Sequence, residues 1–314
     1  MGNGTGFTNG RRVVGRTVTM RAPAKVNLHL EVLRQRHDGY HDIETVLQAV
    51  ALFDQVAVTL VEQYPGGEPR IELTVDGPRN LAADETNLCW QAARHFCRRM
   101  KVSGHIALHL AKTIPMAAGL GGGSSDAAAV LVACNELFGT GLESGELEAL
   151  GADLGADVPF FIGGGTAIGR GIGTDLTPLP RIRTGQFLIV KPDIHLKTPD
   201  VYDAFKMGLT VNSAKVNIKV IKSLLARFPQ RNWPGFNRLE EVVLPSQPVV
   251  QRLVHRLQEL APVAMLSGSG SAAFGVFAAE EDLAEYIAEF VEAGLYVKVV
   301  GPHPAGVEQV HGSS

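Results

Sequence analysis

The sequence predicts a mixed α and β protein of two domains. Its 314 residues are more than one domain of ordinary size needs, and they are enough to bury a large core. Segments with the period-two pattern of strands alternate along the chain with segments of helical period. The pattern changes near residues 181–185, so we place one domain at residues 18–180 and a second at residues 181–314.

The composition excludes several broad classes of function. Hydrophobic residues make up 45% of the chain and charged residues 19%, as in ordinary soluble globular proteins. The formal net charge of -3 argues against a nucleic-acid partner. Apolar runs such as residues 43–53 are broken by polar residues before they reach the roughly 18 residues of a membrane span. We therefore expect no membrane partner and a cytoplasmic location.

Residues 1–17 are expected to form a disordered extension or a tag remnant. They begin with a stretch rich in Gly, Asn and Thr, and they lack the apolar segment of a secretory signal. The three cysteines, Cys89, Cys97 and Cys134, have no paired spacing that would indicate a zinc site. We expect them to be reduced thiols that are buried on helices.

Residues 17–32 are predicted to form a strand, because apolar and polar side chains alternate along them. Lys25, Asn27 and His29 then project to one side, opposite the apolar face. A polar strand face of this kind usually meets solvent, which is the alternative to a site. The turn that follows, at residues 37–41, carries an aromatic ring and an imidazole.

The rest of the first domain is expected to alternate strands and helices. Residues 43–50 fit a helix or a strand equally well, and residues 87–100 are predicted to form an amphipathic helix. His105 and His109 have the spacing of a helical metal pair, but the residues between them alternate as in a strand, which disfavours metal ligation. Further strands are predicted at residues 55–61, 71–75 and 166–170.

A glycine-rich loop at residues 115–126 gives the strongest indication of a site. Its glycines let the backbone approach a ligand closely, and residues 127–137 after it have helical character. The start of a helix offers unpaired N–H groups and the positive end of the helix dipole. This combination is typical of an anion site, most simply a phosphate site.

The loop differs from the common nucleotide motifs. It has no Gly-Lys-Ser/Thr ending of a P-loop, and it lacks the strand and the acidic residue that accompany a dinucleotide-binding loop. Ser124 and Ser125 can supply hydroxyls to phosphate or to Mg²⁺, and the nearby Lys112 can add a positive charge. These residues favour a nucleotide-phosphate site over the alternative, a glycine-rich structural turn.

Asp157 is a candidate catalytic residue. It stands among small and apolar residues beside Pro159, where a plain surface charge is unexpected. The alternative is that it caps a helix. In a phosphoryl transfer it would accept the proton of the acceptor hydroxyl, and Lys25 would keep it ionised. The spacing of the two residues does not show that they meet.

The second domain is predicted to begin with a strand at residues 187–190. Thr198 and Pro199 have the signature of a helix start, and this helix contains Tyr202. Residues 265–277 have the pattern of a strand, a turn of small residues and another strand. Amphipathic helices are predicted at residues 216–227, 249–260 and 282–293.

Five motifs, taken in order, resemble the GHMP kinase superfamily over residues 18–300. They lie at residues 23–28, 38–41, 115–126, 155–161 and 266–270. The resemblance implies an α+β protein with the α/β two-domain GHMP kinase fold, in which a ribosomal protein S5 domain 2-like nucleotide domain precedes a ferredoxin-like domain. Two features depart from the usual pattern: the residues at 271–273 after the last motif, and Tyr202 where a phenylalanine often stands.

The resemblance also implies an activity. The chain is expected to use ATP and Mg²⁺ to phosphorylate the 2-hydroxyl of a cytidine diphosphate-linked methylerythritol in the non-mevalonate isoprenoid pathway. A kinase of homoserine or mevalonate is one alternative, which the motif at residues 38–41 disfavours. A non-catalytic binding protein is another, but it would be expected to have lost Lys25, Asp157 or the loop glycines. The expected partners are the two substrates, bound by a monomer or a homodimer.

The same resemblance implies roles for single residues. Asp157 is expected to be the base, and Lys25 its electrostatic partner. The ATP site is expected to comprise Asn87, Lys112, Pro115, Gly119, Leu120, Gly121, Gly122, Gly123, Ser124 and Ser125. The substrate site is expected to comprise Asn27, Tyr40, His41, Asp157, Thr198 and Tyr202, with two tyrosines on either side of the cytosine. The resemblance assigns no side chain to the metal.

Overall fold

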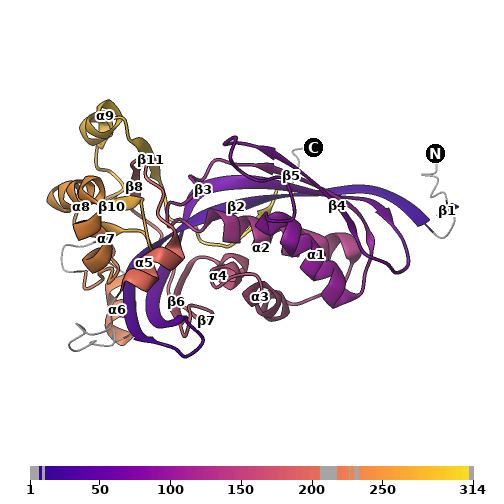
Figure 1. Cartoon of the computed structure of the whole chain (residues 1–314). Helices are drawn as coiled ribbons and strands as arrows, with labels where there is room; N and C mark the ends of the chain where they lie inside the picture. Colours follow the sequence, from indigo (N-terminus) through magenta and orange to yellow (C-terminus); the bar gives the residue numbers. More distant parts are fainter. Residues whose placement is uncertain (1–6, 9–10, 206–217, 226, 230–232, 311–314) are drawn as a thin grey trace.

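The computed structural model describes residues 7–8, 11–205, 218–225, 227–229 and 233–310. These residues form two sheets with helices packed on them, one at the right of Figure 1 and one at the left. Both sheets have mostly antiparallel strands, and β4 and β5 of the first sheet form a parallel pair. Within the described residues, no helix combines the length and the apolar character that a membrane crossing requires.

The first sheet is built on a long hairpin of β2 (Arg11–Gln35) and β3 (His41–Gln63). One irregularity in its register falls at Pro23, which has no N–H to donate to the ladder. The strand order is β1-β2-β3-β5-β4, while β6 pairs with β3 and β7, and β12 pairs with β2. The other strands are β1 (Phe7–Thr8), β4 (Arg70–Asp76), β5 (Gly104–Ala111), β6 (Thr166–Arg170), β7 (Asp175–Pro178) and β12 (Glu308–Gln309).

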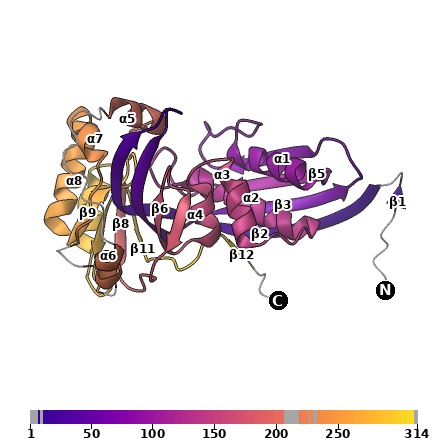
Figure 2. The ribbon, with the colours of Figure 1, turned by 90° about the horizontal axis from the view of Figure 1, so that it is seen from below.

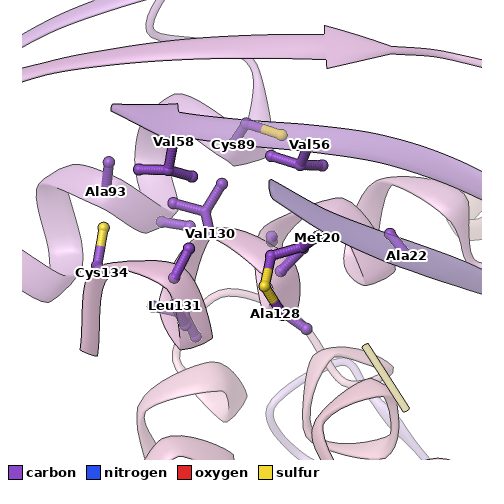
Figure 3. Packing of buried hydrophobic residues seen from close by; sticks show 14 of the residues in the cluster. Met20, Ala22, Val56, Val58, Cys89, Ala93, Ala128, Val130, Leu131 and Cys134 are labelled. Atoms are coloured by element: carbon purple, nitrogen blue, oxygen red, sulfur yellow. The ribbon is translucent and has the colours of Figure 1, made fainter. Parts of the chain in front are cut away.

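The helix α2 (Gly122–Phe138) lies at the centre of the first core. Figure 3 shows Val130 and Leu131 of this helix in one cluster with Met20 and Val58 of the sheet. Alanines fill much of the buried surface of α2, so its backbone can approach the strands closely. Its neighbours are α1 (Leu88–Met100), α3 (Ser144–Ala152) and α4 (Val158–Gly163).

The second sheet has the strand order β11-β8-β10-β9, and all its pairs are antiparallel. The chain runs strand, helices, two strands, helix, strand, which confirms the predicted ferredoxin-like arrangement. The strands are β8 (Gln186–Lys191), β9 (Val263–Leu266), β10 (Ala273–Phe277) and β11 (Tyr296–Val300). The helices are α5 (Thr198–Ala204), α6 (Ile218–Leu225), α7 (Glu240–Ser246), α8 (Pro248–Leu260) and α9 (Ala284–Glu292).

The structure corrects the prediction for the beginning of the chain. Residues 11–17 belong to β2, so the expected disordered extension is wrong for them; residues 1–6 and 9–10 lie outside the described part. The segment at residues 43–50, which was compatible with both patterns, is part of β3. The first sheet ends with β7 and the second begins with β8, close to the predicted boundary, but β12 returns to the first sheet.

Most other predicted elements are confirmed. The segment that carries His105 and His109 is the strand β5, and the three cysteines are free thiols buried on α1 and α2. The helix predicted at residues 216–227 appears as α6; residues 216–217 and 226 lie outside the described part. The helix after the glycine loop begins at Gly122, earlier than the predicted residue 127, so the second half of the loop is its first turn.

Candidate active site

A cavity of about 1040 Å³ opens beside the start of α2. It is lined by the polar face of β2, the turn at residues 38–41, the glycine loop and α5. All the predicted site residues line this cavity except Ser125. The side chain of Ser125 is fully buried and its backbone N–H donates to Gly121 O at 3.0 Å, so its assignment to the phosphate site stays a prediction.

Lys25 and Asp157 meet in the cavity. Lys25 Nζ lies 3.8 Å from Asp157 Oδ2, and the two side chains are 5% and 40% exposed. Lys25 Nζ also donates to Asn27 Oδ1 at 2.7 Å, and Asn27 Nδ2 donates to Thr45 Oγ1 at 2.8 Å. The ammonium group is therefore held in place from β2 and β3, while the carboxylate remains open to a ligand.

Burial and charge act in opposite directions on Lys25. Burial lowers the pKa of Lys25 below its ordinary value, and the negative charge of Asp157 partly offsets this shift. Asp157 occupies the N-cap position of α4, but its side chain makes no capping hydrogen bond. The helix-cap alternative is therefore right that Asp157 stands at the start of a helix, but the carboxylate does not bond to the N–H groups of that helix.

His29 does not join Lys25 and Asn27 in the cavity. The register of the hairpin shifts between Asn27 and His29, so the simple alternation along β2 fails there. The imidazole of His29 is fully buried, with its ring edge-to-face against Phe236 at 4.7 Å. Burial lowers the pKa of His29 to about 4, so the ring is neutral and packs as part of the interior.

The glycine-rich motif at residues 266–270 packs against the backbone of the glycine loop. A Cβ added at Gly119, where φ is +71°, would lie 1.9 Å from Ser267 O. Ser267 Oγ donates to Gly119 O at 3.0 Å, and Ala272 N donates to Ala118 O at 3.2 Å. The two segments, far apart in sequence, thus fix each other's backbone, which explains the glycine at residue 119.

The start of α2 forms the end of the cavity that suits an anion. Gly121 is the N-cap residue with φ +72°, and a Cβ there would lie 2.6 Å from the ring of Phe161. The backbone N–H of Lys25 donates to Leu120 O at 2.9 Å, so the loop is tied to β2. The first N–H groups of a helix have no partner within it, and those of α2 belong to residues that line the cavity.

Lys112 lies behind this helix start in a buried cluster. Its Nζ pairs with Asp54 and, at 2.8 Å, with Asp126 Oδ2. Asp126 Oδ1 is buried without a hydrogen-bond partner, and burial raises the pKa of Asp126 to about 8 against the opposing charge of Lys112. A Cβ at Gly122 would come within 2.7 Å of Lys112 Nζ, so the ammonium touches the first turn of α2.

The lining of the cavity also contains a pair of rings. His41 and Tyr202 lie with their centroids 5.3 Å apart and their planes tilted by 35°. Burial and the charge of Asp157 raise the pKa of the Tyr202 hydroxyl, so it stays protonated. Tyr40, the other predicted aromatic, lines the cavity with a side chain that is 60% exposed.

Some lining residues were not predicted. Ser269 Oγ lies 2.8 Å from Thr198 Oγ1, which joins the last glycine-rich motif to α5. Thr45 and the loop at residues 80–82 also line the cavity, and no pattern in the sequence marks them. Asn87, predicted for the ATP site, lines the cavity and caps α1, because its Oδ1 accepts the N–H of Cys89 at 2.9 Å.

Comparison with known proteins identifies the family. The family model of the GHMP kinases N terminal domain matches residues 87–165. A 4-diphosphocytidyl-2-C-methyl-D-erythritol kinase of Geobacter metallireducens is 38% identical over 277 residues, which are 85% of this chain and 92% of that protein. The chain belongs to the 4-diphosphocytidyl-2-C-methyl-D-erythritol kinase family.

Solved structures agree with membership of this kinase family. A crystal structure of 4-(cytidine 5'-diphospho)-2C-methyl-D-erythritol kinase is 34% identical, with a TM-score of 0.73 over 90% of this chain and 98% of that one. A homoserine kinase from Cytophaga hutchinsonii is 19% identical, with a TM-score of 0.72 over 94% and 97% of the two chains, and shares the fold. As a GHMP kinase, the chain is a small-molecule kinase with the predicted two-domain α+β fold.

Proposed function

We propose that the chain transfers the γ-phosphoryl group of ATP to the 2-hydroxyl of 4-diphosphocytidyl-2-C-methyl-D-erythritol, in the non-mevalonate pathway to isoprenoid precursors. One observation carries this proposal. The Lys25–Asp157 pair lies on the same cavity as the start of α2 and the rings of His41 and Tyr202. A small-molecule kinase needs a phosphate-binding site, reacting groups and an acceptor pocket that open onto one cavity.

The glycine loop is the proposed donor site. Backbone N–H groups at Gly122, Gly123 and Ser124, together with the helix dipole, suit the phosphates of ATP. The loop at residues 80–82 and Asn87 line the same cavity and are proposed to enclose the adenosine. Lys112 is proposed to add its charge from beneath the helix start, held there by its two carboxylate partners.

Asp157 and Lys25 are the proposed reacting pair. The acceptor oxygen attacks the γ-phosphorus, the bond from that phosphorus to the oxygen of ADP breaks, and the hydroxyl proton passes to Asp157. Lys25 stabilises the negative charge that develops on the acceptor oxygen. Its bond to Asn27 keeps the ammonium in one orientation, so little rearrangement is needed during the reaction.

The acceptor pocket is proposed to hold the cytidine end of the substrate. The rings of His41 and Tyr202 offer flat faces, with Tyr40 beside them on the same cavity. Stacking of a base on such rings contributes about 1 kcal/mol beyond the burial of apolar area. Thr198 and Asn27 are proposed to bind polar groups of the same substrate.

Mg²⁺ is proposed to arrive with the nucleotide. In nucleotide sites this ion usually takes one or two protein ligands, phosphate oxygens and water. The described residues contain no group of three or more His, Cys, Asp or Glu side chains that could form a dedicated metal cage. Asp126, with a buried oxygen that lacks a partner, and Ser124 at the cavity fit such a small donor set. The ion would neutralise phosphate charge.

A coupled assay of ATP consumption tests the proposed function. The purified chain would be offered the cytidine-linked methylerythritol, homoserine, mevalonate and galactose in separate reactions. We expect turnover with the first compound at least about 100-fold above the others, because the ring wall and the polar groups select the cytidine. Equal or higher turnover with homoserine or mevalonate would overturn the assignment of the substrate.

A further inference from the structure

Residues 302–309, near the end of the described chain, pack behind α4, the helix that follows Asp157. We call this segment the C-terminal strap. His303 N donates to Ala49 O at 2.8 Å, which fastens one end of the strap to β3. At the other end β12 pairs with β2 (Figure 2), beside an ion pair between Arg21 and Glu308. No residue of the strap lines the cavity, so it does not contact the substrates directly.

The strap and the end of α4 are in very close contact. A Cβ added at Gly306 would lie 2.1 Å from Phe161 O, and one at Gly164 would lie 2.0 Å from the backbone of Ala305. Val307 N donates to Phe161 O at 2.8 Å, so the strap satisfies a carbonyl at the end of the helix. The backbone of α4 therefore cannot shift toward the strap, and the strap has no space for a side chain at residue 306.

The same helix reaches the reacting groups at its other end. Asp157 occupies its N-cap position, about one helical turn before Phe161. The ring of Phe161 lies against Gly121 in the phosphate loop. A displacement of the helix at the strap is therefore transmitted to the carboxylate that faces Lys25.

We propose that the C-terminal strap is a positioning element that sets the distance between Asp157 and Lys25. Gly306 is its critical residue, because any side chain there must push Phe161 O and with it the helix. The inference rests on the proposed role of Asp157 as the base. A misplacement of about 1 Å at reacting groups can cost about 100-fold in rate, so the effect is measurable.

The test compares two alanine variants within the same part of the chain. Gly306→Ala should lower kcat by about tenfold or more, and the KM for the cytidine substrate should stay within about twofold, because the ring wall does not touch the strap. Gly301→Ala is the matched control, since a Cβ there meets nothing within 4 Å. It should retain wild-type kcat. A kcat for Gly306→Ala within about twofold of wild type would overturn the inference.

A double-mutant cycle separates positioning from general damage. If the strap acts through Asp157, Gly306→Ala should cost little further rate in an Asp157→Asn background. Full multiplicative losses would mean that the strap acts elsewhere, and would overturn the proposal. If Gly306→Ala does not fold, Val307→Pro is tested in its place, because it deletes the N–H donated to Phe161 O. The same loss of kcat and the same result in the Asp157→Asn background are expected. An inactive wild-type chain, by contrast, would refute the proposed function itself.

Discussion

The carboxylate of Asp157 faces Lys25 at 3.8 Å and leaves the helix that it precedes without a side-chain cap. A capping aspartate would use its oxygens on the N–H groups of the first helical turn. Here that stabilisation is absent, and the oxygens lie in a cavity beside a buried ammonium group. A residue that gives up local stability in this way is typical of a reacting group.

Asp157→Asn should lower kcat by about 100- to 10,000-fold, because the variant cannot accept the hydroxyl proton. The affinity for ATP should be nearly unchanged, since Asp157 is assigned to the acceptor. Steady-state kinetics and nucleotide titration give the two quantities. Asp153→Asn is the control, because Asp153 bonds to His95 on the surface and should be dispensable. Wild-type turnover in Asp157→Asn would refute the assignment.

The rate should fall at alkaline pH earlier than an ordinary lysine predicts. In its proposed role Lys25 must carry a proton to stabilise the developing charge, and burial lowers its pKa below 10.5. The protonated fraction therefore decreases as the pH rises through this lowered pKa. A profile of kcat against pH should show an alkaline limb below pH 10.5, and Lys25→Met should lose this limb along with most of the rate. A limb at or above pH 10.5 in the wild type would contradict this account.

Tyr202→Ala should raise the KM for the cytidine substrate about fivefold, since it removes roughly 1 kcal/mol of stacking. The KM for ATP should not change, because the ring is assigned to the cytidine and not to the nucleotide donor. Tyr202→Phe keeps the ring and should behave as the wild type. If the KM values of both substrates rise together in Tyr202→Ala, the ring has a folding role instead.

The two adjacent serines of the phosphate loop should behave differently. Ser124 lines the cavity, whereas Ser125 is buried inside the domain. Ser124→Ala should raise the KM for ATP several-fold, at about 1 kcal/mol for one lost hydrogen bond. Ser125→Ala should leave it unchanged. The same rise of the KM for ATP in both variants would show that the hydroxyl of Ser125 also contacts the nucleotide, and would contradict this prediction.

Asp54→Asn should lower the free energy of unfolding by about 3 kcal/mol, because it removes one partner from a buried charge cluster. Asp54 is fully buried, pairs with Lys112 and accepts the N–H of Ile114 at 2.8 Å. Glu68→Gln breaks an exposed pair with Arg98 and should cost less than about 1 kcal/mol. Denaturant unfolding of both variants measures the difference, and equal small losses would rule out a structural role for the cluster.

The sequence was sufficient for elements whose hydrophobic period is long and regular. β2, α1 and the second-domain strands β8, β9 and β10 followed from that signal, whereas β11 was not predicted. It misplaced the start of α2, because Gly122 and Gly123 are poor helix formers that the surrounding core holds in helical conformation. It missed α7, which contains Pro245, for a similar reason.

The site was predictable in its parts but not in its assembly. Motifs located Lys25 and Asp157, yet only folding brings them together, since β2 and α4 are distant in sequence. The resemblance assigned both Ser124 and Ser125 to the ATP site, but only Ser124 lines the cavity, since consecutive helical residues point about 100° apart. Only the folded structure shows that Ser269 belongs to the cavity, through its contact with Thr198.

The hairpin of β2 and β3 carries a consequence for how the enzyme meets its substrates. These two paired strands extend from the far end of the first sheet to the side of α5 (Figure 1), and their pairing continues across several shifts of register. A hinged closure of one half on the other would have to bend a hydrogen-bonded ribbon, not swing a loop. The proposed donor and acceptor sites would thus share one hydrogen-bonded hairpin, and closure around the substrates would fall to side chains and loops at the cavity.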